Sequence, residues 1–260
     1  MAMPNELVLV RHGHSEGNLV TAQSKVGNDS LYTSEFREKP VHRWRLTKEG
    51  QDQAKITGKW IIDNIGKDFD RYYVSPYART CETAGLLGLP DAEWRIDQRL
   101  RERDWGDIGS LPRSEFRTMF PQNALIKKID GLYWRPPGGE SIADVRLRVR
   151  DFFDTLHREC EGKRVIVVTH GEFMWATRAE VEYMTDIKWI EADNDPLQKI
   201  HNAHVLQYTR INPISHDHSE HLDWTRNICP WIDNNKNISW SKIKRKRYNN
   251  KELLQKIILL

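Results

Sequence analysis

The chain of 260 residues lacks a long hydrophobic run, and the longest one near the N-terminus spans only Leu7 to Val10. That length is far too short for a signal peptide or a membrane span, so we expect a cytoplasmic protein with no transmembrane segment. Cysteine is also scarce: Cys81, Cys160 and Cys229 are odd in number and widely spaced. This pattern fits neither a disulfide framework nor a paired zinc site, and it indicates free thiols in a reducing compartment.

A broad excess of positive charge is missing as well. The net charge is +3, from 40 Lys and Arg against 37 Asp and Glu. Residues 240–260 hold seven of these bases and one acid, which leaves 33 bases and 36 acids in the rest of the chain. Because that remainder is slightly acidic, we expect no nucleic-acid partner for it.

The basic residues of the C-terminal end are interspersed with apolar ones, including Leu253, Leu254, Ile257, Ile258 and Leu260. We therefore predict one domain over residues 1–239, followed by a basic and apolar tail over residues 240–260. An amphipathic helix in this tail would suit an anionic membrane, a nucleic acid or a partner protein. The alternative is that the tail packs back on the domain or stays mobile.

Two short apolar runs, residues 7–10 and 165–168, do not alternate with polar residues. This pattern is typical of strands that are buried on both faces of a parallel sheet. Each run leads into a His-Gly step, with His12 after the first and His170 after the second. Ligands bind at the carboxyl ends of strands in open α/β sheets, so the two histidines mark a candidate site.

Helical patterns fill the intervals between these strands. Ser141 is a suitable N-cap for a helix that ends near Cys160, and Thr47 for one that ends near Gly66. A third helix is expected after Gly171, and short strands are expected at residues 72–74 and 205–208. The alternation predicts an α/β fold, with three α/β/α layers around a largely parallel central sheet.

Residues 106–139 interrupt this alternation with nine glycines and prolines. We interpret the stretch as a lid-like insertion that covers one side of the site. The alternative is a small helical module that packs on the domain without touching substrate.

Five segments in order resemble the signature of the histidine phosphatase (phosphoglycerate mutase-like) superfamily. They are Arg-His-Gly-His-Ser-Glu-Gly-Asn at residues 11–18, Ser-Pro-Tyr-Ala-Arg-Thr-Cys-Glu-Thr-Ala at residues 75–84, Leu-Arg-Glu-Arg-Asp-Trp-Gly at residues 100–106, Pro-Gly-Gly-Glu-Ser at residues 137–141 and Val-Thr-His-Gly at residues 168–171. The resemblance implies a phosphatase that forms a phosphohistidine on His12, with Glu102 as the acid and no metal or other cofactor. Asp104 is the alternative acid.

The chemistry of these residue types agrees with that assignment. Arg11 and Arg79 can each present a planar fork of donors to two phosphate oxygens. His170, when protonated, and Asn18 can add further donors, and a neutral imidazole at His12 can attack phosphorus. Four more residues complete the predicted phosphate- and substrate-binding set: Ser15, Gly171, Trp134 and Arg135.

Two alternatives to hydrolysis stay open at this point. One is cofactor-dependent mutase chemistry, although Gly17 stands where such mutases usually have Trp, and Glu172 where they have Asn. The other is a non-catalytic module that binds phosphate or acts as a scaffold. The substrate is expected to be a small phosphorylated metabolite.

A second histidine cluster lies at residues 216–221, where His216, His218 and His221 approach the spacing of a two-metal hydrolase pattern. Such a cluster can bind Zn²⁺ or Ni²⁺. The motif falls late in the chain and no histidine follows it, so a solvated loop is the preferred interpretation.

Overall fold

The computed structural model describes residues 2–232 and 239–257 of the chain. The strands in this described part are β1 (Glu6–Arg11), β2 (Arg71–Val74), β3 (Trp94–Ile96), β4 (Arg164–Thr169), β5 (Val205–Thr209), β6 (Trp224–Ile228) and β7 (Ser241–Lys242). The α-helices are α1 (Glu16–Lys25), α2 (Ser34–Glu38), α3 (Lys48–Asn64), α4 (Ala78–Leu86), α5 (Arg113–Met119), α6 (Pro121–Ile129), α7 (Ile142–Glu159), α8 (Gly171–Val181), α9 (Asp186–Asn194) and α10 (Asn250–Ile257).

The strands form one sheet in the order β3-β2-β4-β1-β5-β6-β7. The predicted α/β fold is confirmed, and the four strands from β3 to β1 are parallel as expected. The pairs β1–β5, β5–β6 and β6–β7 are antiparallel, so the sheet is mixed. The strand predicted at residues 205–208 is β5, but the sequence pattern did not reveal β6, which is only partly buried and contains no unbroken apolar run.

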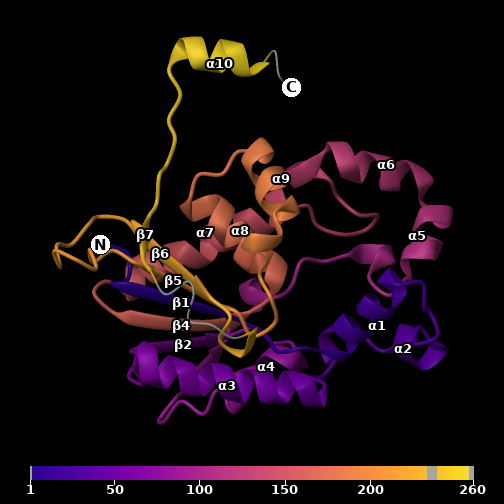
Figure 1. The fold of residues 1–260 in the computed structure, drawn as a ribbon, viewed down its shortest axis with the longest axis horizontal. Helices are drawn as coiled ribbons and strands as arrows, with labels where there is room; N and C mark the ends of the chain where they lie inside the picture. The colour runs from indigo at the N-terminus through magenta and orange to yellow at the C-terminus, as the bar shows by residue number, and fades with distance from the viewer. Residues whose placement is uncertain (1, 233–238, 258–260) are drawn as a thin grey trace.

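Helices cover both faces of the sheet, with α3 and α4 on one side and α7 and α8 on the other (Figure 1). Leu7 and Leu9 of β1 belong to the core beneath α7 and α8. Val8 and Val10 belong to the core beneath α3 and α4. Successive side chains of a strand point to opposite faces, so an unbroken apolar strand is buried from both sides.

The predicted helix starts are confirmed by their caps. Ser141 Oγ accepts a hydrogen bond from the backbone N–H of Asp144, and the backbone N–H of Ser141 donates to the Asp144 carboxylate, which makes a capping box for α7. Thr47 Oγ1 accepts from the backbone N–H of Gly50 at 3.2 Å and begins α3. Such caps satisfy N–H groups that have no partner inside the helix.

The stretch over residues 106–139 and the C-terminal tail both contain helices or strands. Residues 106–139 contain α5 and α6, and a bidentate ion pair joins Arg37 of α2 to Glu115 of α5 at 2.8 and 2.6 Å. In the tail, β7 pairs with β6, and Arg245 donates to Val181 O at 2.7 Å. Figure 1 shows α10 beyond an extended segment, away from the sheet. Residues 258–260, which include Ile258 and Leu260, lie outside the described part.

No helix among residues 2–232 and 239–257 is both long and apolar enough to cross a membrane. The three histidines of the other candidate cluster, His216, His218 and His221, are exposed between β5 and β6. Within the described residues these histidines form no group with metal-ligand distances.

Candidate active site

The two His-Gly steps meet because β1 and β4 are adjacent parallel strands. Arg11 pairs with Thr169 in register, so His12 and His170 leave the same edge of the sheet. Their ring centroids are 5.1 Å apart. Strand β2 lies on the other side of β4 and leads into α4, whose first turn carries Arg79.

His12 is held in one tautomer. Its Nδ1 lies 2.7 Å from the carbonyl oxygen of Gly13, which can only accept, so Nδ1 carries the proton. Nε2 is therefore unprotonated, and its lone pair accepts a hydrogen bond from Arg79 Nε at 3.2 Å. Burial, followed by the charges of Arg79 and Arg11, lowers the pKa of His12 well below its usual value. The neutral ring that results is the nucleophilic form.

His170 is fully buried beside His12. Its Nε2 lies 2.8 Å from Ser75 Oγ, whereas Nδ1 is buried without a hydrogen-bond partner. Burial and the charge of Arg79 lower its pKa well below the usual value, so the ring is neutral at pH 7 unless an anion offsets the arginines. If the Ser75 hydroxyl donates to Nε2, the Nδ1–H is left as a donor for a ligand.

Arg11 and Arg79 supply positive charge at the same point. Arg11 Nη1 donates to Ile200 O at 2.7 Å, and its Nε is buried with no partner. Arg79 Nη1 donates to Val41 O at 2.9 Å. Burial lowers the pKa of Arg79 to about 10, so it remains charged at pH 7. Each guanidinium is thus fixed by one backbone carbonyl and keeps other donors available.

Glu102 joins the two histidines. One ligand atom from each of Glu102, His12 and His170 lies within 4.8 Å of the others. The backbone N–H of Arg103 donates to Glu102 Oε1 at 2.9 Å. These distances would admit a metal ion, but two adjacent guanidinium groups favour an anion instead.

Asp104, the alternative acid, is engaged elsewhere. It is exposed, and its Oδ1 accepts from the backbone N–H of Gly106 at 2.8 Å. It is not a member of the group formed by His12, Glu102 and His170. The geometry therefore favours Glu102 for proton transfer.

Ser15 and Asn18 form the capping box of α1. Asn18 Oδ1 accepts from Ser15 Oγ at 3.0 Å and from Asn202 Nδ2 at 2.9 Å. Asn202 also donates to His12 O at 3.3 Å, which links the loop before β5 to the predicted nucleophile. Nothing in the sequence pattern pointed to Asn202, which lies outside the five recognised segments.

The remaining predicted residues occupy different environments. Gly171 packs against Arg11, since an added Cβ would lie 3.2 Å from Arg11 Nε. Trp134 is buried, with the Arg103 guanidinium carbon 5.2 Å from its ring centre. Arg135 is 61% exposed and pairs with Asp144 in the first turn of α7 at 2.7 Å. The contacts described for Arg135 do not connect it to the histidine pair.

The start of α3 supports the loop that carries the predicted nucleophile His12, called the nucleophile loop below. The sequence patterns also missed this contact. His14 N donates to Gln53 Oε1 at 2.8 Å, and Thr47 N donates to His14 O at 2.9 Å. Gly13 and Gly50 allow the two backbones to touch: a Cβ on Gly13 would lie 2.2 Å from Gly50 O. The only sequence signal for this contact was a glycine on each side.

The opposite side of the site holds a carboxylate balanced by cations. Glu172, in the first turn of α8, lies 3.7 Å from Arg103. Burial raises its pKa to about 7, although Arg103 and Lys127 act in the other direction. Lys127 lies against two indole rings, 4.8 Å from the centre of Trp134 and 5.3 Å from that of Trp105.

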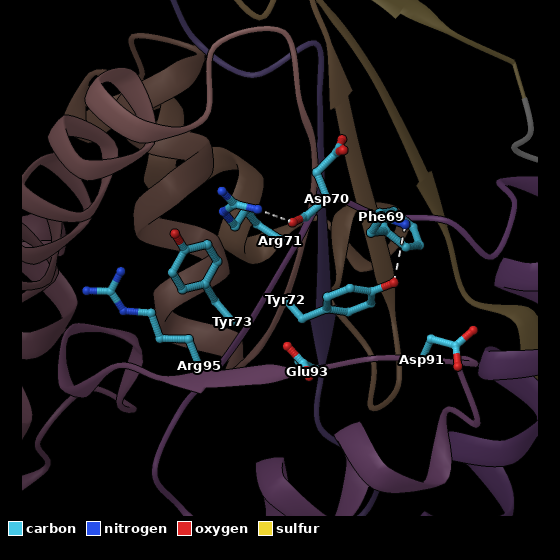
Figure 2. Close-up of a pocket in the computed structure, with 8 residues that line it drawn as sticks. All are labelled: Phe69, Asp70, Arg71, Tyr72, Tyr73, Asp91, Glu93 and Arg95. Atoms are coloured by element: carbon cyan, nitrogen blue, oxygen red, sulfur yellow. Dashed lines mark hydrogen bonds between the residues drawn. The ribbon is translucent and has the colours of Figure 1, made fainter.

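A pocket of about 370 Å³ lies elsewhere, at the N-terminal ends of β2 and β3. His12 and His170 follow the C-terminal ends of β1 and β4, at the other edge of the sheet. Figure 2 shows Tyr72 and Tyr73 on its walls, pointing to opposite faces of β2. Tyr72 Oη accepts from Phe69 N at 3.3 Å. None of the predicted catalytic residues lines this pocket, so it is not the candidate active site.

Comparison with known proteins adds to this geometry. The family model of the histidine phosphatase superfamily (branch 1) matches residues 7–209. A 2,3-bisphosphoglycerate-dependent phosphoglycerate mutase from Parvibaculum lavamentivorans is 33% identical over 184 residues, covering 65% of this chain and 76% of that protein. Among solved structures, a mycobacterial glucosyl-3-phosphoglycerate phosphatase aligns with a TM-score of 0.61 and 23% identity, over 79% of this chain and 91% of its own. A phosphoserine phosphatase from Entamoeba histolytica aligns with a TM-score of 0.60 and 19% identity, over 92% of this chain and 98% of its own.

Proposed function

Because the chain belongs to the histidine phosphatase superfamily, we propose that it hydrolyses phosphate monoesters of small metabolites through a phosphohistidine on His12. The observation that carries the proposal is the state of His12. Its Nδ1–H donates to the Gly13 carbonyl, and its unprotonated Nε2 lies 3.2 Å from Arg79 Nε, whose guanidinium charge would attract a phosphate to this nitrogen.

In the first step, the Nε2 lone pair of His12 attacks phosphorus and the bond from phosphorus to the ester oxygen breaks. Glu102 in its acid form gives its proton to the departing alkoxide. Arg11, Arg79 and the Nδ1–H of His170 stabilise the charge on the other phosphate oxygens.

In the second step, the Glu102 carboxylate takes a proton from water while the water oxygen attacks phosphorus. The phosphorus–nitrogen bond breaks, its electron pair returns to His12 Nε2, and inorganic phosphate leaves. Glu102 ends protonated, so the cycle closes without another reactant.

We also propose a cytoplasmic location, which the free thiols of Cys81, Cys160 and Cys229 support.

The second candidate is phosphoryl transfer as in the mutases, and the 33% identity to one such protein favours it. Position 17 argues for hydrolysis, because a Cβ there would lie 2.3 Å from the ring of Trp44. The Trp that is usual in mutases at this position therefore has no room. Transfer and hydrolysis share the first step and differ in which acceptor reaches the phosphohistidine.

The decisive test is release of inorganic phosphate from p-nitrophenyl phosphate in excess chelator, comparing the native chain with His12→Ala. His157→Ala, an exposed histidine on α7, is the matched control. Turnover that resists chelator, survives in the control and disappears in His12→Ala supports the proposal. Turnover that needs metal or survives in His12→Ala refutes it. Interconversion of phosphoglycerates without phosphate release would identify the mutase.

A further inference from the structure

The tail beyond β7 is anchored to the domain as far as Arg245. Ile243 packs against the core, and its backbone N–H donates to Asp223 O at 2.7 Å. Arg245 donates to Leu222 O and to Val181 O, both at 2.7 Å. An extended segment then leads to α10, which lies away from the sheet in Figure 1. Helix α10 therefore projects beyond the last anchor of the tail.

Helix α10 begins at a local cap. The backbone N–H of Glu252 donates to Asn249 Oδ1 at 3.0 Å, and the backbone N–H of Asn249 donates to Glu252 Oε2 at 2.9 Å, which makes a capping box. Helices shorter than about 12 residues are marginal in water when they stand alone, and α10 spans only Asn250–Ile257. A surface that covers one side of α10 would therefore stabilise it.

One side of α10 is apolar and lacks such cover. Leu253 and Leu254 are 47% and 67% exposed, and neither packs against the two core clusters in the part of the chain that the structure describes. Lys251 is exposed and lies three residues before Leu254, so the two are neighbours on the helix surface. An apolar strip edged by a lysine is typical of helices that lie in the plane of a membrane interface.

The tail also carries an excess of positive charge. Residues 240–260 hold seven bases and one acid, whereas the rest of the chain has 33 bases and 36 acids. The one acid, Glu252, is engaged in the cap of α10. Among the described residues, no carboxylate forms an ion pair with Lys244, Arg247 or Lys251. Their charge is therefore available to an anionic surface.

We propose that the tail binds an anionic lipid surface, with Leu253 and Leu254 at the headgroup boundary and the basic residues against the lipid charges. A stable protein interface buries about 800 Å² per partner, far more than two leucines supply. A nucleic acid would leave the leucines in water, and pairing with a second copy would bring two positively charged tails together. Lipid binding by the tail is independent of the proposed function, since none of the residues assigned to catalysis takes part.

Flotation of the full chain with vesicles measures this binding. Vesicles of phosphatidylcholine alone would be compared with vesicles that also contain phosphatidylserine, at low and at high salt. Each base near an anionic membrane contributes about fivefold to partitioning, so three exposed bases contribute about 100-fold. We expect binding to the anionic vesicles only, weakened by high salt, and slower cleavage by trypsin after Arg247 when those vesicles are present.

Two variants separate the charge of the tail from its apolar contact. Lys244→Gln with Arg247→Gln and Lys251→Gln should lower partitioning about 100-fold. Leu253→Gln with Leu254→Gln keeps every charge and should lower it about tenfold or more, because the apolar contact is lost. Arg245 stays in both variants, so the anchor of the tail on the domain is preserved.

The matched control removes three charges from another part of the surface. Lys55→Gln, Lys59→Gln and Lys67→Gln change exposed residues in and just beyond α3, which lies on the far side of the sheet from α10 (Figure 1). This control should partition as the native chain does. Circular dichroism melts of all the variants show whether each one is folded.

Three results would overturn the proposal: equal partitioning to both kinds of vesicle, native partitioning in the tail variants, or an equal loss in the control. Failure to bind vesicles together with retention of single-stranded DNA would make a nucleic acid the partner. Failure to bind vesicles together with a dimer that Leu253→Gln with Leu254→Gln dissociates would make a second copy the partner. Turnover of p-nitrophenyl phosphate tests the proposed function separately, so either one can fail alone.

Discussion

Replacing Gly50 by Ala should damage catalysis through backbone contact alone. An added Cβ at this position would lie 2.0 Å from the carbonyl oxygen of His14 and 2.7 Å from its nitrogen. Both are backbone atoms of the nucleophile loop, so either α3 or the loop must move. A displacement of about 1 Å at a catalytic group costs on the order of 100-fold in rate, and we expect that loss in kcat/KM.

The same contact sets the effect on stability. Overpacking against a rigid backbone costs up to about 3 kcal/mol, while replacing a helical Gly by Ala returns about 1 kcal/mol. The net loss of about 2 kcal/mol corresponds to a fall of about 4–8 °C in Tm for a chain of this size. Circular dichroism melts and p-nitrophenyl phosphate kinetics on the same preparation measure both quantities.

Two other glycines provide matched controls. Gly58 lies on the same helix, and its added Cβ would lie 2.0 Å from Leu87 O, remote from the nucleophile loop. Gly58→Ala should therefore lose similar stability but keep the kcat/KM of the folded protein. Gly85 in α4 has nothing within 4 Å, so Gly85→Ala should match or exceed native stability. Gly50→Ala with native kcat/KM, or Gly58→Ala with the same loss of rate, would refute the reasoning.

Three further predictions concern proton transfer and buried histidines. Glu102→Gln should lower kcat on glycerol phosphate, which has a poor leaving group, by about 100- to 10,000-fold, whereas Asp104→Asn should keep a kcat near the native value. A larger loss of kcat in Asp104→Asn than in Glu102→Gln would make Asp104 the acid. Ser75→Ala leaves His170 Nε2 buried without its partner and should lower kcat/KM about tenfold or more, and unchanged kinetics would contradict that role. Burial lowers the pKa of His204 to about 4, so below about pH 6.5 the unfolded chain gains a proton that the folded chain excludes. The free energy of unfolding should therefore fall by on the order of 2 kcal/mol per such histidine from pH 7 to pH 5. In urea melts, His204→Gln should show a flatter dependence of this free energy on pH than the native chain.

Local patterns predicted the elements whose signal is contained in a short stretch. The caps at Ser141 and Thr47 and the unbroken run of residues 165–168 each produced the expected helix or strand. Strand β6 escaped because its residues are only partly buried and do not form an apolar run. Its position depends on pairing with β5, which is a property of the assembled sheet.

The same distinction separates the recognised site residues from the missed ones. His12, Glu102 and His170 lie in segments whose order along the chain resembled a known family. Asn202 reaches His12 only because β5 pairs with β1, and nothing next to it in the sequence indicates that approach. Contacts that arise from packing of distant segments cannot be inferred from a pattern within either one.

The hydrogen bonds that the loop before β5 makes to His12 have a consequence for protein synthesis. The carbonyl of His12 accepts from Asn202 Nδ2 and from Ala203 N, the latter at 3.0 Å. A growing chain that has left the ribosome as far as α8 already carries both histidines, yet the nucleophile loop still lacks these restraints. If the proposed function holds, activity should therefore appear late in translation, after β5 has emerged and paired with β1, and nascent fragments should not consume phosphorylated metabolites.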